Sequence, residues 1–350
     1  MPGRKTMRIA VAGAGPIGRR HLQAIEAVPS CRATAVVDPA PAGAEAAAEY
    51  GLPHFPNLER MLEAARPDGV IVATPNATHV PLAIDCVRRG VPVLVEKPVA
   101  DTLEAALTLA DASEASATPV LVGHHRRHNP VVAKAREVVQ SGALGHLVAV
   151  SAVWLVRKPA DYFQAAWRRE PGGGPVLINL IHDIDSLRFI VGDIAAVQAM
   201  TSNARRGFAV EDTAVVLLRF ANGALGTVTL SDAAAAPWSW ELTAGERTSY
   251  DFPTTGQDCY VLAGTEASLA VPSLRVWRHD GPADWLSPLA AERIAVEQAD
   301  PIRAQVAHFA DVIGGLAEPL VTAWDAARTL EATLAVTRSA ATAREIELSL

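Results

Sequence analysis

The sequence predicts an α/β protein with an N-terminal doubly wound parallel sheet and a C-terminal α+β domain that holds a large, mostly antiparallel open sheet. Short apolar segments alternate with helical stretches as far as residue 123, which is typical of a parallel sheet. Beyond residue 197 the chain is richer in β segments and in turns such as Asn222-Gly223. A length of 350 residues also favours two domains, which we place at residues 1–125 and 126–350.

Composition excludes several classes of protein. The net charge of -7 argues against general nucleic-acid binding, which needs an excess of Lys and Arg. No run of about 20 apolar residues suggests a membrane span, and the apolar part of residues 1–14 is too short for a signal peptide. Three scattered cysteines share no metal-type spacing and indicate reduced thiols in a cytoplasmic protein.

The first strand, residues 7–12, leads into a glycine-rich turn of the form G-x-G-x-x-G and then a helix to about residue 28. In this setting the first glycine makes the tight turn, the second lets a pyrophosphate approach, and the third lets helix pack on strand. The amino end of the helix offers N–H groups to the phosphates. The turn therefore predicts a dinucleotide site, formed by Gly13, Gly15, Pro16, Ile17 and Gly18.

The second strand, residues 34–37, ends at Asp38, about 20 residues past the last glycine. There a carboxylate would accept hydrogen bonds from the adenosine ribose, although Asp38 alone is equally typical of a turn before Pro39. A carboxylate repels a 2′-phosphate, and residues 39–42 contain no Arg or Lys to neutralise one. The sequence thus favours NAD over NADP.

The remaining elements follow in order. In the N-terminal domain we expect helices at 42–50, 57–65, 79–89 and, after a capping box at 101–104, to about 116, with strands at 69–73, 92–95 and 119–123. In the C-terminal domain we expect helices at 131–140, 302–313 and 324–342, and strands at 147–154, 197–201, 213–220, 224–230, 238–243 and 268–271.

Lys97 follows a predicted buried strand at residues 92–95, within Glu96-Lys97-Pro98. Ligands of open α/β sheets collect outside the carboxyl ends of the strands, so Lys97 would lie where a cofactor and a substrate meet. Taken alone, Lys97 is equally consistent with an ordinary exposed loop lysine. The dinucleotide motif upstream favours the functional interpretation.

Four motifs together resemble the Gfo/Idh/MocA family of sugar and cyclitol oxidoreductases over essentially the whole chain. They are the glycine turn with Asp38, Thr74-Pro75-Asn76 with His79, Glu96-Lys97-Pro98, and the Gly172–Gly174 turn before His182-Asp183-Ile184-Asp185. The resemblance implies an N-terminal Rossmann domain, an active-site Lys97 beside the nicotinamide, and a Pro98 that is often cis. It also implies a dimer or tetramer formed through the C-terminal sheet. The residues it implies at the cofactor, besides the glycine turn and Asp38, are Thr74, Pro75, Asn76, His79, Glu96, Lys97, Trp167 and Arg168.

Hydride transfer from a secondary alcohol to NAD requires a base for the hydroxyl proton and a donor for the developing alkoxide. His182 suits the first task and Lys97 the second, and a lowered lysine pKa would let them exchange roles. His182 alone is as well explained as a buried structural histidine. The family pattern also has an aspartate four residues before this histidine, where this chain has Ile178, and Asn179 follows it. Asn179 can hydrogen-bond a substrate but cannot act as a base.

Cationic and aromatic residues near the expected site suggest a polyhydroxylated ring, with or without a carboxylate. The cations are His124, His125, Arg126, Arg157, Lys158 and Arg168, which could equally serve cofactor phosphates or surface ion pairs. The substrate contacts that we predict are Lys97, His124, Trp154, Arg157, Tyr162, Asn179 and His182. We predict no metal, since the histidines at 124, 125 and 128 have no carboxylate at ligand spacing.

Three functions remain open at this point. The first is an NAD-dependent dehydrogenase acting on a secondary hydroxyl or the matching ketone of a sugar, cyclitol, sugar acid or cyclic hydroxy acid. The second is an NAD-dependent glycosidase or epimerase-type enzyme, in which a transient oxidation leaves no net NADH. The third is a non-catalytic NAD-binding regulator, against which the presence of Lys97 and His182 argues.

Overall fold

The computed structural model describes residues 5–246 and 253–349 and divides them into two compact units. The first unit runs to His128 and also includes Asp300–Leu330. The second comprises Asn129–Ala299 and the chain from Glu331 onward. The sequence analysis had assigned residues 300–330 to the second domain. They join the first unit because helix α9 (Pro301–Ile313) packs on its sheet, with Phe309 and Ile313 against Gly69.

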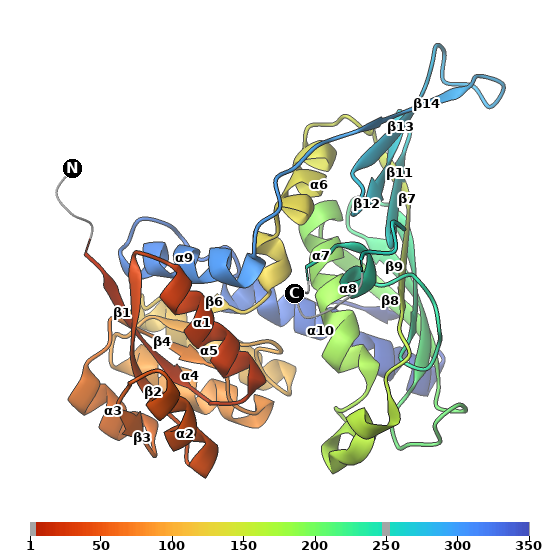
Figure 1. Ribbon diagram of the computed structural model, residues 1–350. Helices are drawn as coiled ribbons and strands as arrows, with labels where there is room; N and C mark the ends of the chain where they lie inside the picture. Colours follow the sequence, from red (N-terminus) through yellow and green to blue (C-terminus); the bar gives the residue numbers. More distant parts are fainter. Residues whose placement is uncertain (1–4, 247–252, 350) are drawn as a thin grey trace. The chain divides into compact units, whose positions relative to one another are not determined.

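A six-stranded parallel sheet forms the centre of the first unit, in the order β3-β2-β1-β4-β5-β6 (Figure 1). This is the strand order of the classic dinucleotide-binding fold, and it confirms the predicted doubly wound sheet. The three strands β4, β5 and β6 are wholly buried runs rich in Val and Ile, as a strand covered on both faces requires. The strands are β1 (Met7–Ala12), β2 (Cys31–Val37), β3 (His54–Phe55), β4 (Gly69–Val72), β5 (Val93–Val95) and β6 (Val120–Val122).

The helices of the first unit agree with those predicted to within a few residues at each end. One detail differs: the N-cap of α5 is Thr102, whose hydroxyl accepts the backbone N–H of Ala105 at 3.2 Å, so the helix begins at Leu103 and not within a box that starts at Asp101. The helices are α1 (Pro16–Ala27), α2 (Pro41–Glu49), α3 (Leu58–Ala65), α4 (His79–Arg88), α5 (Leu103–Ser116) and α9 (Pro301–Ile313).

The second unit contains a nine-stranded sheet in the order β14-β13-β12-β11-β7-β10-β9-β8-β15. Its strand pairs are antiparallel except for β7 with β10, which confirms the predicted mostly antiparallel sheet. The strands are β7 (Leu147–Leu155), β8 (Ile194–Ser202), β9 (Thr213–Phe220), β10 (Leu225–Ser231), β11 (Tyr260–Gly264), β12 (Ala267–Val271), β13 (Arg275–His279), β14 (Leu289–Arg293) and β15 (Ile346–Glu347).

One face of this sheet is covered and the other is open. The helices α6 (Pro130–Gln140) and α7 (Ile181–Val191) pack on one face (Figure 1). Within the residues that the structure describes, no helix lies on the other face. Strand β9 shows the consequence, since Val216 and Leu218 are buried whereas Val215 and Leu217 are about half exposed. The sheet therefore exposes an apolar face, which we call the open face.

Two segments differ from expectation. Residues 238–243 do not form a strand, because Ser239 caps the short helix α8 (Trp240–Thr243) by accepting the N–H of Leu242 at 3.3 Å. The segment before His182 is a π-helix, Val176–Leu180, which continues into α7. The long helix α10 (Ala323–Thr342) was predicted within one residue. No helix in the described parts of the chain is both long and apolar enough to cross a membrane.

Candidate active site

The predicted site residues fall on both units, and the glycine turn of the first unit explains the spacing of its glycines. Gly13 has a φ of +97°, and a Cβ there would lie 2.3 Å from the carbonyl oxygen of Ala73. A Cβ on Gly18 would lie 1.9 Å from the carbonyl oxygen of Gly13. A Cβ on Gly15 would meet nothing within 4 Å. Gly13 and Gly18 thus serve close backbone packing, whereas Gly15 leaves open the space that a pyrophosphate needs.

The amino end of α1 is available to an anion. Gly15 is the N-cap, no side chain caps the helix, and Pro16 occupies its first position. Gly15 and Pro16 are exposed and Ile17 is partly exposed. Uncapped N–H groups and the helix dipole at this end suit the phosphates of a dinucleotide.

Asp38 lies beside this turn at the end of β2. Its Oδ2 accepts the backbone N–H of Ala14 and its Oδ1 accepts that of Ala40, both at 2.8 Å. A carboxylate has about four acceptor positions, so ribose hydroxyls can still bind. Asp38 therefore fixes the glycine turn and keeps a negative charge beside it.

His79 joins two loops at the carboxyl edge of the parallel sheet. Its Nε2 lies 2.8 Å from the carbonyl oxygen of Thr74, and its Nδ1 lies 2.8 Å from that of Pro98. The ring is 1% exposed, so protein atoms occupy both ring nitrogens. His79 holds the loop that carries Thr74, Pro75 and Asn76 against the loop that carries Lys97, and this arrangement explains its place in the motif.

A buried ion pair fixes the segment that carries Lys97. Oε1 of Glu96 lies 2.7 Å from Nε2 of His21 on α1, and Oε2 accepts the backbone N–H of Lys97 at 3.1 Å. Burial raises the pKa of Glu96, but the hydrogen bond from His21 and the positive charges of His21, His125 and Lys97 outweigh it and hold the pKa at about 2. The Lys97–Pro98 peptide is cis, as the resemblance implied.

His21 is a site residue that the sequence analysis missed. It lies three residues after the last glycine of the turn, on the face of α1 that meets the sheet, and it is fully buried. A polar residue on the buried face of an amphipathic helix was the available signal. Its role is visible only when Glu96 is found beside it.

The histidine cluster after β6 is mostly internal. His124 is 1% exposed, and residues His125–His128 form a short 3-10 helix. Among the residues that the structure describes, no group of three or more His, Cys, Asp or Glu side chains is placed to hold a metal ion.

In the second unit, Asn179 lies within the π-helix and His182 lies in the first turn of α7. Oδ1 of Asn179 accepts a hydrogen bond from Nζ of Lys158 at 2.7 Å. His182 is partly exposed, whereas Asp183 is buried and hydrogen-bonded to the hydroxyl of Tyr260. π-Turns shift the register of a helix and are frequent at functional sites. Here the π-turn contains Ile178, the position at which the resemblance implies an aspartate, and Asn179, which follows it.

Lys158 is the second feature that the sequence did not single out, although it stood among the candidate cations. Its side chain is 10% exposed, and Nζ lies 3.7 Å from Oδ2 of Asp232. Burial lowers the pKa of Lys158 to about 8, and Asp232 and Glu241 only partly oppose that effect. A buried ammonium group of this kind can donate a proton or a hydrogen bond near neutral pH.

The aromatic residues differ in what they can contact. Trp154 is 2% exposed, belongs to the core of the second unit, and donates its indole N–H to Glu241 at 2.8 Å. The strand position of Trp154 points its side chain into the core of the second unit, and its contact with a substrate ring stays a prediction. Tyr162 lies beneath two cations, with Lys158 Nζ 4.5 Å and Arg168 Cζ 3.9 Å from the ring centroid.

Three further predicted residues keep accessible surface or a fixed position. Trp167 is 53% exposed. Arg168 donates to the carbonyl oxygen of Tyr162 at 2.6 Å, and Arg157 is exposed at the end of β7. Whether they contact cofactor or substrate stays a prediction.

Comparison with protein families agrees with this architecture. The family model described as "Oxidoreductase family, NAD-binding Rossmann fold" matches residues 7–124, and the one described as "GFO/IDH/MocA C-terminal domain" matches residues 132–270. The chain therefore belongs to the Gfo/Idh/MocA oxidoreductase family, and its first unit is an NAD-binding Rossmann domain. The glycine turn and the free amino end of α1 fit that cofactor.

Among curated proteins, the chain is similar to the rhizopine catabolism protein MocA of Rhizobium meliloti, at 34% identity over 53% of this chain and 57% of the relative. It is also similar to inositol 2-dehydrogenase 2 of Saccharopolyspora erythraea, at 33% identity over 63% of this chain and 65% of the relative. Each match spans less than two thirds of the relative's length.

Solved structures share the fold along the whole chain. An oxidoreductase from Agrobacterium radiobacter, in complex with NAD+, L-tartaric acid and magnesium, has a TM-score of 0.82 and 20% identity, with 98% of both chains covered. The WlbA dehydrogenase from Bordetella pertussis, in complex with NADH and UDP-GlcNAcA, has a TM-score of 0.80 and 21% identity, with 99% of both chains covered.

Proposed function

We propose that this protein is an NAD-dependent dehydrogenase that oxidises a secondary hydroxyl of a sugar-like compound or reduces the matching ketone. The observation that carries the proposal is Lys97, which follows β5 of an NAD-binding domain and is held there by the Glu96–His21 pair. The similarity to an inositol 2-dehydrogenase supports a cyclic polyol or a related ring as the substrate class.

Lys97 and His182 would share the proton transfer. When bound, NAD supplies the acceptor for the hydride. A protein base must then take the hydroxyl proton, and a cationic donor must hold the oxygen as negative charge develops. We assign the proton to His182 and the donor role to Lys97, because His182 is partly exposed in the first turn of α7. Asn179 would orient a substrate hydroxyl and cannot take its proton.

NAD is the preferred form of the cofactor in this proposal. The carboxylate of Asp38 beside the glycine turn would repel a 2′-phosphate. Residues 39–42, which follow it, include no cation to bind one. We expect tighter binding of NAD than of NADP by calorimetry.

The test of the proposed function is NADH formation with a panel of cyclitols, sugars and sugar acids. Net NADH that grows with substrate consumed supports a dehydrogenase. Substrate conversion with no net NADH would instead indicate a glycosidase or epimerase-type reaction, in which the cofactor is regenerated in each cycle. NAD binding without conversion of any compound would favour a regulator.

We also propose that the protein works in the cytoplasm as a homodimer or homotetramer formed through the open face. A hollow of about 520 Å³ lies on this face, lined mainly by apolar side chains such as Leu217, Leu225 and Val261. An apolar surface of this kind is usually covered by a partner, and a second copy offers a self-complementary one.

A further inference from the structure

A second cavity, which we call the basic pocket, lies in the second unit and has a volume of about 350 Å³. Four cationic side chains line it: Arg157, Lys158, Arg205 and Arg206. Two come from the segment after β7, and two come from the loop between β8 and β9. Residues far apart in the sequence therefore bring four positive charges to one cavity.

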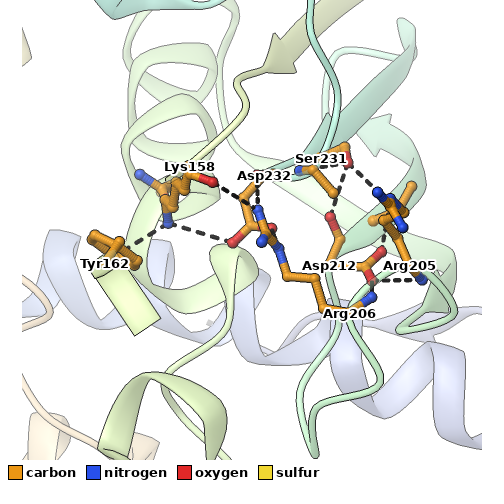
Figure 2. A network of polar contacts seen from close by, with 10 residues as sticks. Lys158, Tyr162, Arg205, Arg206, Asp212, Ser231 and Asp232 are labelled. Carbon is orange, nitrogen blue, oxygen red and sulfur yellow. Dashed lines mark hydrogen bonds and ion pairs between the residues drawn. The ribbon is translucent and has the colours of Figure 1, made fainter. Parts of the chain in front are cut away.

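The loop that supplies two of these arginines is fixed by hydrogen bonds. Oδ2 of Asp212 accepts the backbone N–H groups of Arg205 and Arg206 at 3.0 and 2.8 Å (Figure 2). The carbonyl oxygen of Asn203 accepts the N–H of Gly207 at 2.7 Å, which closes the turn. These bonds fix the backbone of the loop at the two arginines.

Arg206 is itself an anchored part of the wall. Its Nε donates to Oδ1 of Asp232 at 2.9 Å, and its terminal nitrogen donates to the carbonyl oxygen of Lys158 at 3.2 Å (Figure 2). Its guanidinium also lies 4.1 Å from the ring centroid of Phe163. These contacts join the two segments that form the pocket.

The positive charge of the pocket is only partly neutralised. Asp232 forms ion pairs with Arg206 and Lys158. The carboxylate of Asp212 accepts hydrogen bonds from backbone N–H groups and from the hydroxyl of Thr213. Within residues 5–246 and 253–349, the guanidinium groups of Arg157 and Arg205 are exposed and make no hydrogen bond or ion pair. Two exposed guanidinium groups without a partner on one cavity are suited to a carboxylate or a phosphate.

Lys158 connects the basic pocket to the proposed reaction site. Lys158 lines the pocket, and its Nζ donates to Oδ1 of Asn179, three residues before His182. We propose that the basic pocket binds an anionic group, a carboxylate or a phosphate ester, of the substrate that His182 and Lys97 act on. This inference rests on the proposed function and adds the substrate class: anionic, polyhydroxylated compounds.

The experiment compares matched sets of a neutral polyol, its acid and its phosphate ester, for example D-glucose, D-glucuronate and D-glucose 6-phosphate, and the corresponding cyclitols. NADH formation is measured with the full chain, with the double variant Arg157→Ala/Arg205→Ala, and with Arg88→Ala. Arg88 is an exposed arginine at the end of α4 and controls for the loss of charge. We expect anionic members to have the higher kcat/KM, and the double variant to lose about 10-fold or more of it for them alone.

A neutral member that matches or exceeds its anionic partners would overturn the inference, as would an equal loss for neutral and anionic members in the double variant. The acid and the ester, compared with each other, identify the anion. If no compound is oxidised, the proposed dehydrogenase function fails, but anion binding can still be tested. Calorimetry with inorganic phosphate on the NAD-loaded protein then measures whether the basic pocket binds an anion. Binding that the double variant loses and Arg88→Ala keeps would support an anion site, and no binding to the wild type would overturn it.

Discussion

At the scale of single residues, the three glycines of the turn have two different roles, although the motif writes all of them with the same letter. Gly13 and Gly18 are required by backbone atoms of the protein itself, whereas Gly15 faces open space. The motif predicts all three as parts of a dinucleotide site. Which glycine serves the fold and which serves the ligand follows only from the neighbouring carbonyl groups.

We predict different effects for two alanine substitutions in this turn, one on stability and one on NAD binding. Gly13→Ala should lower the free energy of unfolding by about 1–3 kcal/mol or more, because its Cβ would clash with Ala73 and its φ is positive. Gly15→Ala should change stability by less than about 0.5 kcal/mol but weaken NAD binding. Urea unfolding and calorimetry measure the two quantities. Equal destabilisation by both substitutions would contradict the assignment.

The Glu96–His21 pair predicts a pH dependence of stability. The pKa of Glu96 is about 2 in the folded protein, below its ordinary value of 4.5, so the folded chain keeps a charge that the unfolded chain loses as the pH falls. The stabilisation is fully present above about pH 4.5 and is lost as the pH falls towards 2, at about 1.4 kcal/mol per pKa unit at most. The difference in free energy of unfolding between wild type and Glu96→Gln should therefore become smaller as the pH falls from about 4.5 towards 2. Glu59→Gln, which changes an exposed carboxylate, is the control, and a gap that does not change with pH would refute the prediction.

The sequence alone suggests Lys97, Asp38 and the glycines as site residues, because each belongs to a short motif at the end of a predicted strand; their contacts with a ligand stay a prediction. It could not single out Lys158 or His21, since the burial and partners that define them come from distant segments. The sequence also could not show that Trp154 is buried, because its strand register decides which face of the sheet the side chain lies on.

At the scale of elements, the predicted and observed bounds agree best where the apolar pattern is long. They agree least where a single capping residue determines whether a segment is helical. Helix α10 and strand β9 match their predictions almost to the residue. Residues 238–243 have strand-like composition, yet the Ser239 cap makes four of them helical. No pattern in the sequence signals the π-helix, whose extra residue per turn depends on packing within the second unit.

The N-cap of α5 gives a prediction at this scale. Thr102→Ala removes the acceptor of the Ala105 N–H and should lower the free energy of unfolding by about 1 kcal/mol. Asp101→Ala, one residue outside the cap, should cost clearly less. Chemical denaturation of both variants measures the difference, and a larger effect at Asp101 would restore the capping box that the sequence suggested.

For the whole molecule, the open face predicts assembly. Leu217 is 54% exposed and lines the hollow on this face, so Leu217→Glu should dissociate a dimer or tetramer into smaller species. Leu316→Glu places the same charge on a comparably exposed leucine, 65% exposed, in the first unit and should leave the assembly unchanged. Light scattering coupled to size exclusion reports both masses. A monomeric wild type, or dissociation by Leu316→Glu alone, would contradict the prediction.

The most direct test of the whole account is the rate of NADH formation by the wild type and by Lys97→Met on the compound that the panel identifies. Lys134→Met, which changes an exposed lysine paired with Glu137, is the matched control. We predict that Lys97→Met binds NAD normally but loses about 100-fold or more in kcat, as removal of an acid–base or alkoxide-binding group does, while Lys134→Met keeps full activity. Undiminished NADH formation by Lys97→Met would contradict the assignment of the active site.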